Sequence, residues 1–485
     1  MPRKRQPRIE KVDNDSVLDQ IERVVRWDSE FRLAFIKCNH PAQQETLRHS
    51  LLDRLRDQHI LEISLEKSII SLLDEIRPHW NPNQAPVAVC VYGLENSLRE
   101  QSQNSPVLGR LNHERDLLRQ SIPAALLIWL PDFALDYVAR GAPDFWAWRS
   151  GVYEFQTDSG LWKTESIAAF GNHNATSLAS LAWADKEKEI ARLEELLRTS
   201  QALAKQDKQV KKTNVRLLNQ LGLLYKNLGR QDKALDSYQK SLKLAQNIGD
   251  RAGEGATLNN LSALYHARGD YDTALRYLQE SLAIRRAIGD QAGEGTTLNN
   301  LSALYHARGD YDTALRYLQE SLVIQRAIGD QAGEGTTLNN LSQIYQTRRD
   351  YDTALRYLQE SLVIQRAIGD QAGEGTTLNN LSQIYQTRRD YDTALRYLQE
   401  SLAIKQAIGD RAGLCIALFN IGHSYWEKKD HQQAFICWKE ASRIAKEIGL
   451  SQALMNLEQL AKQLGGSGLE DWEQLSQQAG AGAVE

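Results

Sequence analysis

A unit of forty residues is repeated six times between about residues 211 and 450. The copy that begins at Arg251 reads RAGEGATLNNLSALYHARGDYDTALRYLQESLAIRRAIGD, and the next three copies begin at Gln291, Gln331 and Gln371. The last two of these copies differ at only three positions. One unit is too small to bury its own apolar face, so successive units must pack against each other. The repeat therefore predicts an α-solenoid.

Each unit has the pattern of two helices. In the first, apolar residues recur at three- and four-residue spacing, which marks one face of a helix. Gly269 follows and can adopt the left-handed conformation that ends a helix, and Asp270 or Asp272 can cap the second helix. We expect Gly289 to end that helix and Asp290 to cap the next unit. The residues that mark the two faces are Leu258, Leu261, Leu264 and Tyr265, and then Tyr271, Ala274, Leu278 and Leu282.

These helix pairs resemble the tetratricopeptide repeat. The resemblance rests on a leucine, a small residue and a tyrosine in the first helix, and an alanine and a leucine in the second; they are Leu261, Ser262, Tyr265, Ala274 and Leu278. The unit length, the Ile-Gly-Asp end and the Thr-Leu-Asn-Asn-Leu run resemble kinesin light chains and Pins-type adaptors. The sequence departs from the family at Ser281, where the family prefers alanine. The resemblance implies an all-α superhelix that binds a protein or peptide.

Composition favours a soluble protein without a strong electrostatic preference. Of the 485 residues, 25% are charged and 42% hydrophobic, and the net charge is −4. This balance gives no general attraction to nucleic acid or to an anionic membrane. The basic start MPRKRQPR is followed by no apolar run, so it is not a secretory signal. The four cysteines show no metal or disulfide spacing, which favours a reducing cytoplasm.

The N-terminal part alternates short apolar runs with helical segments, which predicts a parallel sheet covered on both faces. The expected strands are 31–38, 60–65, 85–95 and 124–131, and the expected helices are 15–28, 41–58, 67–80 and 105–121; the segments 132–148 and 151–155 follow the fourth strand. Seven aromatic residues near the end of this part could form either a contact patch or the packed end of a domain: Trp129, Phe133, Phe145, Trp146, Trp148, Tyr153 and Phe155.

This order of strands and helices resembles the core of P-loop NTPases of the AAA and STAND type. The resemblance would make Glu95, after the third strand, the Walker B carboxylate. Walker A would need GxxxxGK[ST] after the first strand. The chain has CNHPAQQETLRHS there, without glycine or lysine. We therefore expect a degenerate nucleotide-binding domain without a cofactor, rather than an enzyme; a working nucleotide-dependent STAND-like switch is the alternative.

The expected organisation has five parts. The charged segment 172–209 forms either one helix that joins sheet to solenoid or half a repeat that caps it. Residues 451–464 form a capping helix, because a terminal repeat needs a polar outer face. The parts are an N-terminal extension with a helix (1–28), a degenerate α/β domain (29–165), a helical linker (166–210), the six-unit array (211–450), and the capping helix with a flexible tail that begins at Gly465 (451–485).

Two adjacent asparagines recur in each near-identical unit. Asparagine is a poor residue for a helix interior, so its repetition indicates a use. A carboxamide donates and accepts, so it can bind a peptide backbone whatever the side chains are. The predicted partner-binding residues are Asn219, Asn259, Asn260, Asn299, Asn300, Asn339, Asn340, Asn379, Asn380 and Asn420, with Gln343, Gln346, Gln383 and Gln386.

The alternative for either asparagine is structural: it bonds to the neighbouring helix and fixes how the units stack. On the family pattern the groove also holds Thr296, Ala303, His306 and Ala307. The family's carboxylate clamp would need Lys or Arg at Asn299 and Ala303, so an acidic C-terminal tail is not the implied ligand. The overall prediction is an interaction scaffold or sensor that binds an extended polypeptide.

Overall fold

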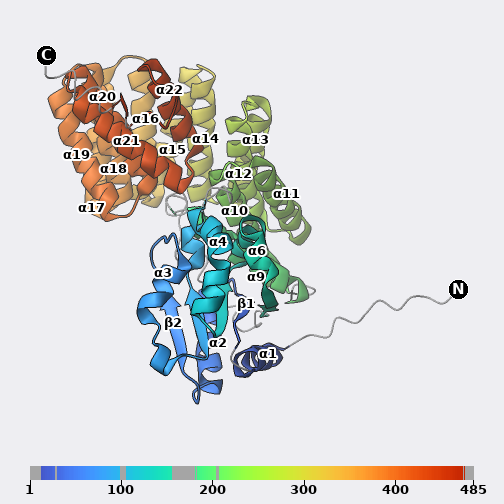
Figure 1. Ribbon diagram of the computed structural model, residues 1–485. Coiled ribbons are helices and arrows are strands. Elements are labelled where there is room, and N and C mark those ends of the chain that lie inside the picture. The colour runs from blue at the N-terminus through green and yellow to red at the C-terminus, as the bar shows by residue number, and fades with distance from the viewer. Residues whose placement is uncertain are drawn as a thin grey trace, which may run out of the picture. The chain divides into compact units, whose positions relative to one another are not determined.

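The computed structural model describes residues 13–27, 30–98, 105–155, 181, 183–203, 207–472 and 474–475. The chain divides into two compact units. One is an α/β unit that includes the helix beginning at Trp183, and the other is an all-α unit that contains the repeats (Figure 1).

The α/β unit is built on a five-stranded parallel sheet in the order β2-β3-β4-β1-β5. β4 is buried along its whole length, as expected for a central parallel strand covered on both faces. The strands are β1 (Arg32–Lys37), β2 (Ile60–Ser64), β3 (Ala88–Tyr92), β4 (Ala125–Leu130) and β5 (Arg149–Glu154). This confirms the predicted parallel sheet.

Alternate residues of β1 pack on opposite faces of the sheet. Ala34 and Ile36 belong to the core beneath α1 and α2, whereas Phe35 contacts Phe145 of α6 with ring centroids 6.3 Å apart. The predicted aromatic cluster is in part a packed core, since Trp129, Phe145 and Phe155 are buried. The helices of this unit are α1 (Asn14–Arg26), α2 (Pro41–Arg54), α3 (Leu72–Ile76), α4 (Pro106–Ser121), α5 (Asp132–Gly141), α6 (Pro143–Ala147) and α9 (Trp183–Leu203).

Two predicted helical segments differ from the structure. The helix expected over 67–80 is only the short α3, capped by Ser71 and followed by a 3₁₀ turn that contains Pro78. A proline lacks the N–H needed to continue an α-helix. The segment expected as one helix over 172–209 contains α9 and the start of α10; residues 172–180, 182 and 204–206 lie outside the described residues.

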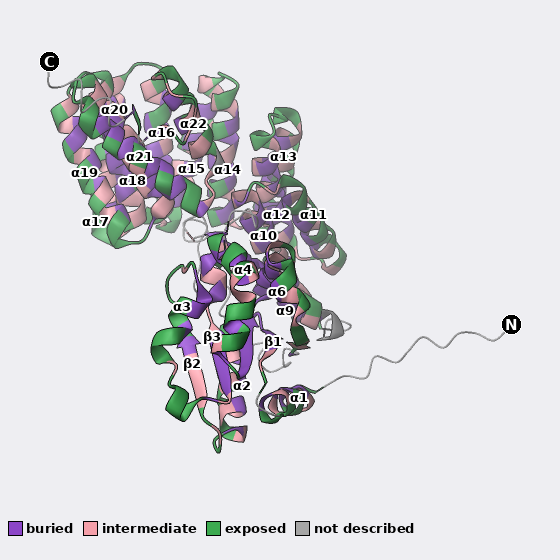
Figure 2. Ribbon diagram, viewed as in Figure 1, coloured by how far each residue is buried: buried purple, intermediate pink, exposed green. Residues whose placement is uncertain are grey.

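The all-α unit is a run of antiparallel helix pairs, and buried positions alternate with exposed ones along its helices (Figure 2). Leu298, Leu301 and Leu304 of one first helix, for example, pack with Ala274 and Leu278 of the preceding unit. The helices are α10 (Lys208–Asn227), α11 (Gln231–Ile248), α12 (Arg251–Ala267), α13 (Tyr271–Ile288), α14 (Gln291–Ala307), α15 (Tyr311–Ile328), α16 (Gln331–Thr347), α17 (Tyr351–Ile368), α18 (Gln371–Thr387), α19 (Tyr391–Ala407), α20 (Arg411–Glu427), α21 (His431–Ile448) and α22 (Ser451–Gln463).

Local sequence signals set the helix ends as predicted. Asp270 caps the second helix of its unit by accepting from the N–H of Thr273, and Asp290 caps the next helix through Gly293. Each such cap stabilises a helix by about 1 kcal/mol. Gly269 and Gly289 have φ of 78° and 68°, the left-handed conformation that ends a helix.

The serine that departs from the family pattern joins the two helices of a unit. Ser281 of α13 donates to the carbonyl of Gly255 in α12 at 2.8 Å, and Ser321 and Ser361 repeat this bond to Gly295 and Gly335. The hydroxyl therefore satisfies a backbone acceptor where the two helices approach closely.

The end of the array is covered by α22 and by residues after it. Leu457 and Ala461 of α22, with Trp472 and Leu475, are buried against Phe435 and Trp438 of α21. The predicted tail at Gly465 is thus wrong as far as Leu475, because Trp472 is only 2% exposed. An apolar residue of this size gains more from packing than from solvent.

Candidate functional site

The predicted asparagines form a hydrogen-bonded ladder through the array. The second asparagine of each unit donates to the first asparagine of the preceding unit. The bonds run from Asn260 to Asn219 (3.1 Å), Asn300 to Asn259 (3.0 Å), Asn340 to Asn299 (3.3 Å), Asn380 to Asn339 (3.1 Å) and Asn420 to Asn379 (2.9 Å).

The first asparagine of a unit also bonds toward the following unit. Asn299 Nδ2 donates to Thr337 at 3.0 Å, and Asn339 Nδ2 donates to Thr377 at 2.7 Å. Asn299, Asn339 and Asn379 are buried, with 6–8% exposure. These carboxamides therefore fix the stacking of units, which was the alternative considered for them.

The second asparagine lies on an exposed strip of the first helix. In α14, Thr296, Ala303 and Ala307 are exposed and Asn300 is half-buried, at spacings that mark one helix face. The same positions in α16 are Thr336, Asn340, Gln343 and Thr347. We call this repeated face the first-helix strip. Asn380 is the exception among second asparagines, because it is buried.

The predicted glutamines lie on or beside this strip. Gln343 is exposed, and Gln346, Gln383 and Gln386 are half-buried. Gln386 already donates to the carbonyl of Asn420 at 3.0 Å and to Ser424 at 2.7 Å. In α14 the equivalent of Gln346 is His306, which contacts Thr347 at 3.0 Å; burial lowers the pKa of His306 below its usual value.

The strip lies in the more tightly packed of the two helix layers. Successive first helices, such as α12 and α14 or α14 and α16, pack directly against each other, more closely than successive second helices do. A recess of about 90 Å³ opens between α12, α13 and α14, lined in part by Ala263, His266, Asn300 and Ala303. The strip thus combines a small recess with polar groups.

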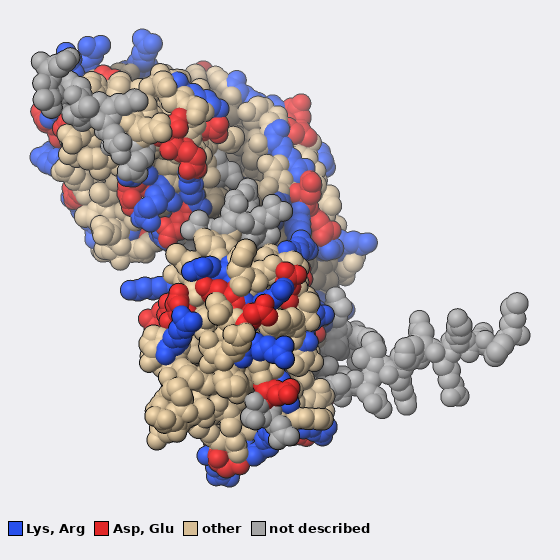
Figure 3. All heavy atoms as spheres, in the orientation of Figure 1, with Lys and Arg blue, Asp and Glu red and all other residues tan. Residues whose placement is uncertain are grey.

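Charged side chains connect the units outside the strip. Arg308, Arg348 and Arg388 pair with Asp272, Asp312 and Asp352 of the preceding unit. On the face of the array that Figure 3 shows, cationic and anionic side chains are interspersed. Ion pairs of this kind at a surface contribute about 0–1 kcal/mol each.

Three cationic residues were not among the functional residues predicted from the sequence. Arg349, Arg389 and Lys429 have φ of 63°, 62° and 65°, in the left-handed region where earlier units have glycine. A non-glycine residue in this conformation costs on the order of 1–3 kcal/mol. A position-by-position comparison of the copies would have revealed them, because Gly309 becomes Arg349 between an arginine and an aspartate that both copies share.

In the α/β unit, α9 crosses the carboxyl ends of the strands. Glu195 accepts from Asn39 after β1 at 2.6 Å, and Lys188 contacts Glu95 after β3 at 3.2 Å. Arg198 lies 3.8 Å from Asp132, which follows β4. Ligands of open parallel sheets bind at this edge. The polar groups there, including the predicted Walker B carboxylate, therefore contact a helix of the same chain.

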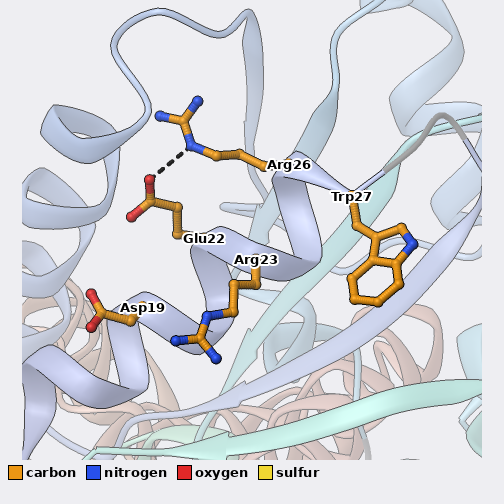
Figure 4. Close-up of a pocket in the computed structure, with 5 residues that line it drawn as sticks. All are labelled: Asp19, Glu22, Arg23, Arg26 and Trp27. Atoms are coloured by element: carbon orange, nitrogen blue, oxygen red, sulfur yellow. Dashed lines mark hydrogen bonds and ion pairs between the residues drawn. The ribbon is translucent and has the colours of Figure 1, made fainter.

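No other candidate metal, catalytic or ligand-binding site is found among the described residues. They contain no cluster of three or more metal-ligating side chains, and burial raises the pKa of Cys38 and Cys90 to about 12, so these thiols are unreactive. A hollow of about 440 Å³ along α1 is lined by Asp19, Glu22, Arg23, Arg26 and Trp27 (Figure 4). Its Arg26 already pairs with Glu22 at 2.7 Å and with Asp57 at 2.8 Å. None of the described helices is long and apolar enough to cross a bilayer.

A comparison with protein families decides what the array is. The family model described as tetratricopeptide repeat matches residues 214–287, 293–367 and 373–447. Residues 214–447 are tetratricopeptide repeats. The boundaries agree with the helix pairs from α10 to α21, so the predicted repeat class is confirmed.

Solved structures resemble this chain in part. BtubC from P. vanneervenii is 28% identical, over 47% of this chain and 92% of its own, with a TM-score of 0.38. A putative kinesin light chain from Podosopora anserina with nearly identical repeats is 18% identical, over 39% and 95%, with a TM-score of 0.32. A STAND protein with a tetratricopeptide repeat sensor from Pyrococcus horikoshii is 12% identical, over 92% and 88%, with a TM-score of 0.42. No curated protein matches this sequence.

Proposed function

We propose that the tetratricopeptide array is an interaction module that binds an extended polypeptide along the first-helix strip. The observation that carries this proposal is the recurrence of one exposed face, with half-buried amides, on consecutive helices of the more tightly packed layer. An enzyme site needs unlike residues that converge at one place. A surface repeated from unit to unit suits a partner that is itself extended.

The two asparagines of a unit have different roles in this proposal. The first, such as Asn299, holds the neighbouring unit in register through Thr337. The second, such as Asn300, donates one N–H to Asn259 and remains partly accessible. Its carboxamide can therefore bind the partner's main chain. Gln343 and Gln346 add amides in the later units. A neutral hydrogen bond contributes about 0.5–1.5 kcal/mol, so several are needed for useful affinity.

Blocking the strip should weaken this binding. Peptides are first selected from a random displayed library on the full-length protein, and their affinity is then measured for the double variant Ala303→Arg and Gln343→Arg. Two long charged side chains on the strip should lower affinity by about tenfold or more, which corresponds to about 1.4 kcal/mol.

The matched control is Val323→Arg with Val363→Arg, on the exposed face of the second helices in the same two units. Both valines are nearly 70% exposed, so this change adds the same charge at no cost to packing. Equal loss of affinity in both double variants, or loss only in the valine variant, contradicts the proposed surface.

The second candidate function is a nucleotide-dependent switch, which the parallel sheet of the α/β unit favours. Glu195 and Lys188 of α9 contact residues at the carboxyl ends of the strands, so a nucleotide would have to displace α9. This argues against the switch. We therefore expect millimolar ATP with Mg²⁺ to leave the melting temperature of the full-length protein unchanged. A ligand present at one hundred times its Kd would add about 2.7 kcal/mol of stability, so an upward shift would favour the switch.

A further inference from the structure

The repeat units are not uniform where they face the solvent. The units 291–330 and 331–370 are identical except at five positions, and these fall within one short segment. Only one of them, the exchange of Leu304 for Ile344, lies in the core. The others are Ala303 and Gln343, His306 and Gln346, Ala307 and Thr347, and Gly309 and Arg349. The change between units is therefore concentrated on the first-helix strip and the turn that follows it.

This change adds one cation to the turn of each later unit. Arg349, Arg389 and Lys429 are exposed and stand where the earlier units have Gly269 and Gly309. Among the described residues, none of the three forms an ion pair or a side-chain hydrogen bond. We call them the turn cations.

The residues directly before the turn cations behave differently. Arg348, Arg388 and Lys428 each pair with an aspartate of the preceding unit. Stacking of the units thus uses one cation per turn. The second cation of each turn forms no ion pair and no side-chain hydrogen bond within the described part of the chain, although it occupies a backbone conformation that suits glycine.

We propose that the turn cations bind acidic side chains of the extended polypeptide that lies on the first-helix strip. This inference rests on the proposed function and specifies its partner. The first half of the strip, with Ala263, Ala303 and the recess beside them, accepts uncharged residues, and the second half binds an acidic segment. On the family pattern a terminal carboxylate would need cations at Asn299 and Ala303, which are neutral, so we expect internal Asp or Glu side chains to be the ligands of the turn cations.

The distance between neighbouring helices also sets the expected spacing of the acidic residues in the bound polypeptide. Neighbouring helices pack roughly 8–10 Å apart, so one turn cation recurs at about that interval along the array. An extended polypeptide advances roughly 3.3 Å per residue, and three residues cover the interval. We expect acidic residues at about every third position of the bound segment.

A polypeptide fits this surface better than a nucleic acid. Each turn cation is followed by an aspartate that caps the next helix, namely Asp350, Asp390 and Asp430. A strand of double-helical DNA carries a phosphate about every 3.4 Å along the helix axis, so its continuous row of phosphates would also meet these carboxylates. A peptide with an acidic residue at every third position can place uncharged residues beside these aspartates.

The test uses two labelled peptides and the full-length protein. One peptide repeats Glu-Ser-Ser and the other repeats Gln-Ser-Ser at the same length, and binding is measured by fluorescence anisotropy at low and high salt. We expect the glutamate peptide to bind at least about tenfold more tightly, and this preference to weaken as salt screens the charges.

The decisive variant is Arg349→Gly, Arg389→Gly and Lys429→Gly. Glycine accepts the left-handed conformation, so the melting temperature should stay the same or rise. The preference for the glutamate peptide should disappear. The control is Arg316→Gln, Arg356→Gln and Arg396→Gln, which removes three exposed cations from the second helices and should leave the preference unchanged.

Three results would overturn the proposal: no binding of the glutamate peptide to the parent protein, an unchanged preference in the glycine variant, or equal loss in the glutamine control. A deoxythymidine oligonucleotide of equal charge that binds as tightly as the peptide would assign the surface to nucleic acid instead. Failure here is distinct from failure of the proposed function. If Ala303→Arg with Gln343→Arg abolishes binding of selected peptides, the strip binds polypeptide whatever the turn cations do.

Discussion

Replacing Asn299, Asn339 and Asn379 together by Ala is expected to destabilise the array by about 1–7 kcal/mol. Each substitution removes at least one hydrogen bond between units at a buried side chain, and we expect a cost of about 1–3 kcal/mol per site. Alanine offsets part of this cost, because it is the better helix former and stabilises the helix by up to about 0.7 kcal/mol per site. Urea unfolding followed by circular dichroism measures the net change.

The companion variant replaces the second asparagines, Asn300 and Asn340, by Ala. These side chains are half-buried, so water can replace the bonds they lose. We expect less than about 1 kcal/mol of destabilisation per site, together with weaker binding of selected peptides. A first-asparagine variant as stable as the parent, or a second-asparagine variant that binds normally, would contradict the division of roles.

Replacing Trp472 by Ala is expected to unfold the C-terminal end of the array. The indole is buried with Leu457 and Leu475 against Trp438, and truncation of such a side chain costs about 3–5 kcal/mol. Each repeat contacts only its neighbours, so the loss should remain near α21 and α22 instead of spreading to α10.

Limited proteolysis with mass spectrometry locates this effect. Early cleavage is expected within 431–463, while fragments from the first units persist. Met455→Ala serves as the control, because Met455 lies on the same terminal helix and is 55% exposed. Uniform cleavage along the whole array, or no change for the Trp472 variant, would show that residues after Gly465 do not cap the repeats.

The repeat period and the local signals predicted most of the fold. A forty-residue period with two apolar stripes defines helix pairs, and Asp270 and Gly289 mark helix ends through contacts within a few residues. These are local interactions, and they were confirmed. The alternation of apolar runs with helical segments likewise predicted the parallel sheet.

The predictions that failed or stayed open depend on distant contacts. Asn299 and Asn300 are adjacent, and only the position of the next unit decides which of them is buried. The charged segment that contains α9 was expected to join the sheet to the solenoid or to cap the repeats, whereas Glu195 is buried and bonds to Asn39, which is 156 positions away in the sequence. Trp472 follows a glycine-rich stretch, and its burial requires a surface formed by α21. The sequence around Asn299, Glu195 or Trp472 gives no information about these distant partners.

Hydrogen exchange of the full-length protein, with and without a selected peptide, tests the central claim most directly. Binding should protect amides in first helices such as α14, α16 and α18, because the bound chain covers their exposed strip and suppresses local opening. Second helices and the α/β unit should exchange as before. Protection that falls on α15 and α17, or on the sheet edge beneath α9, with the first helices unchanged, would contradict the account.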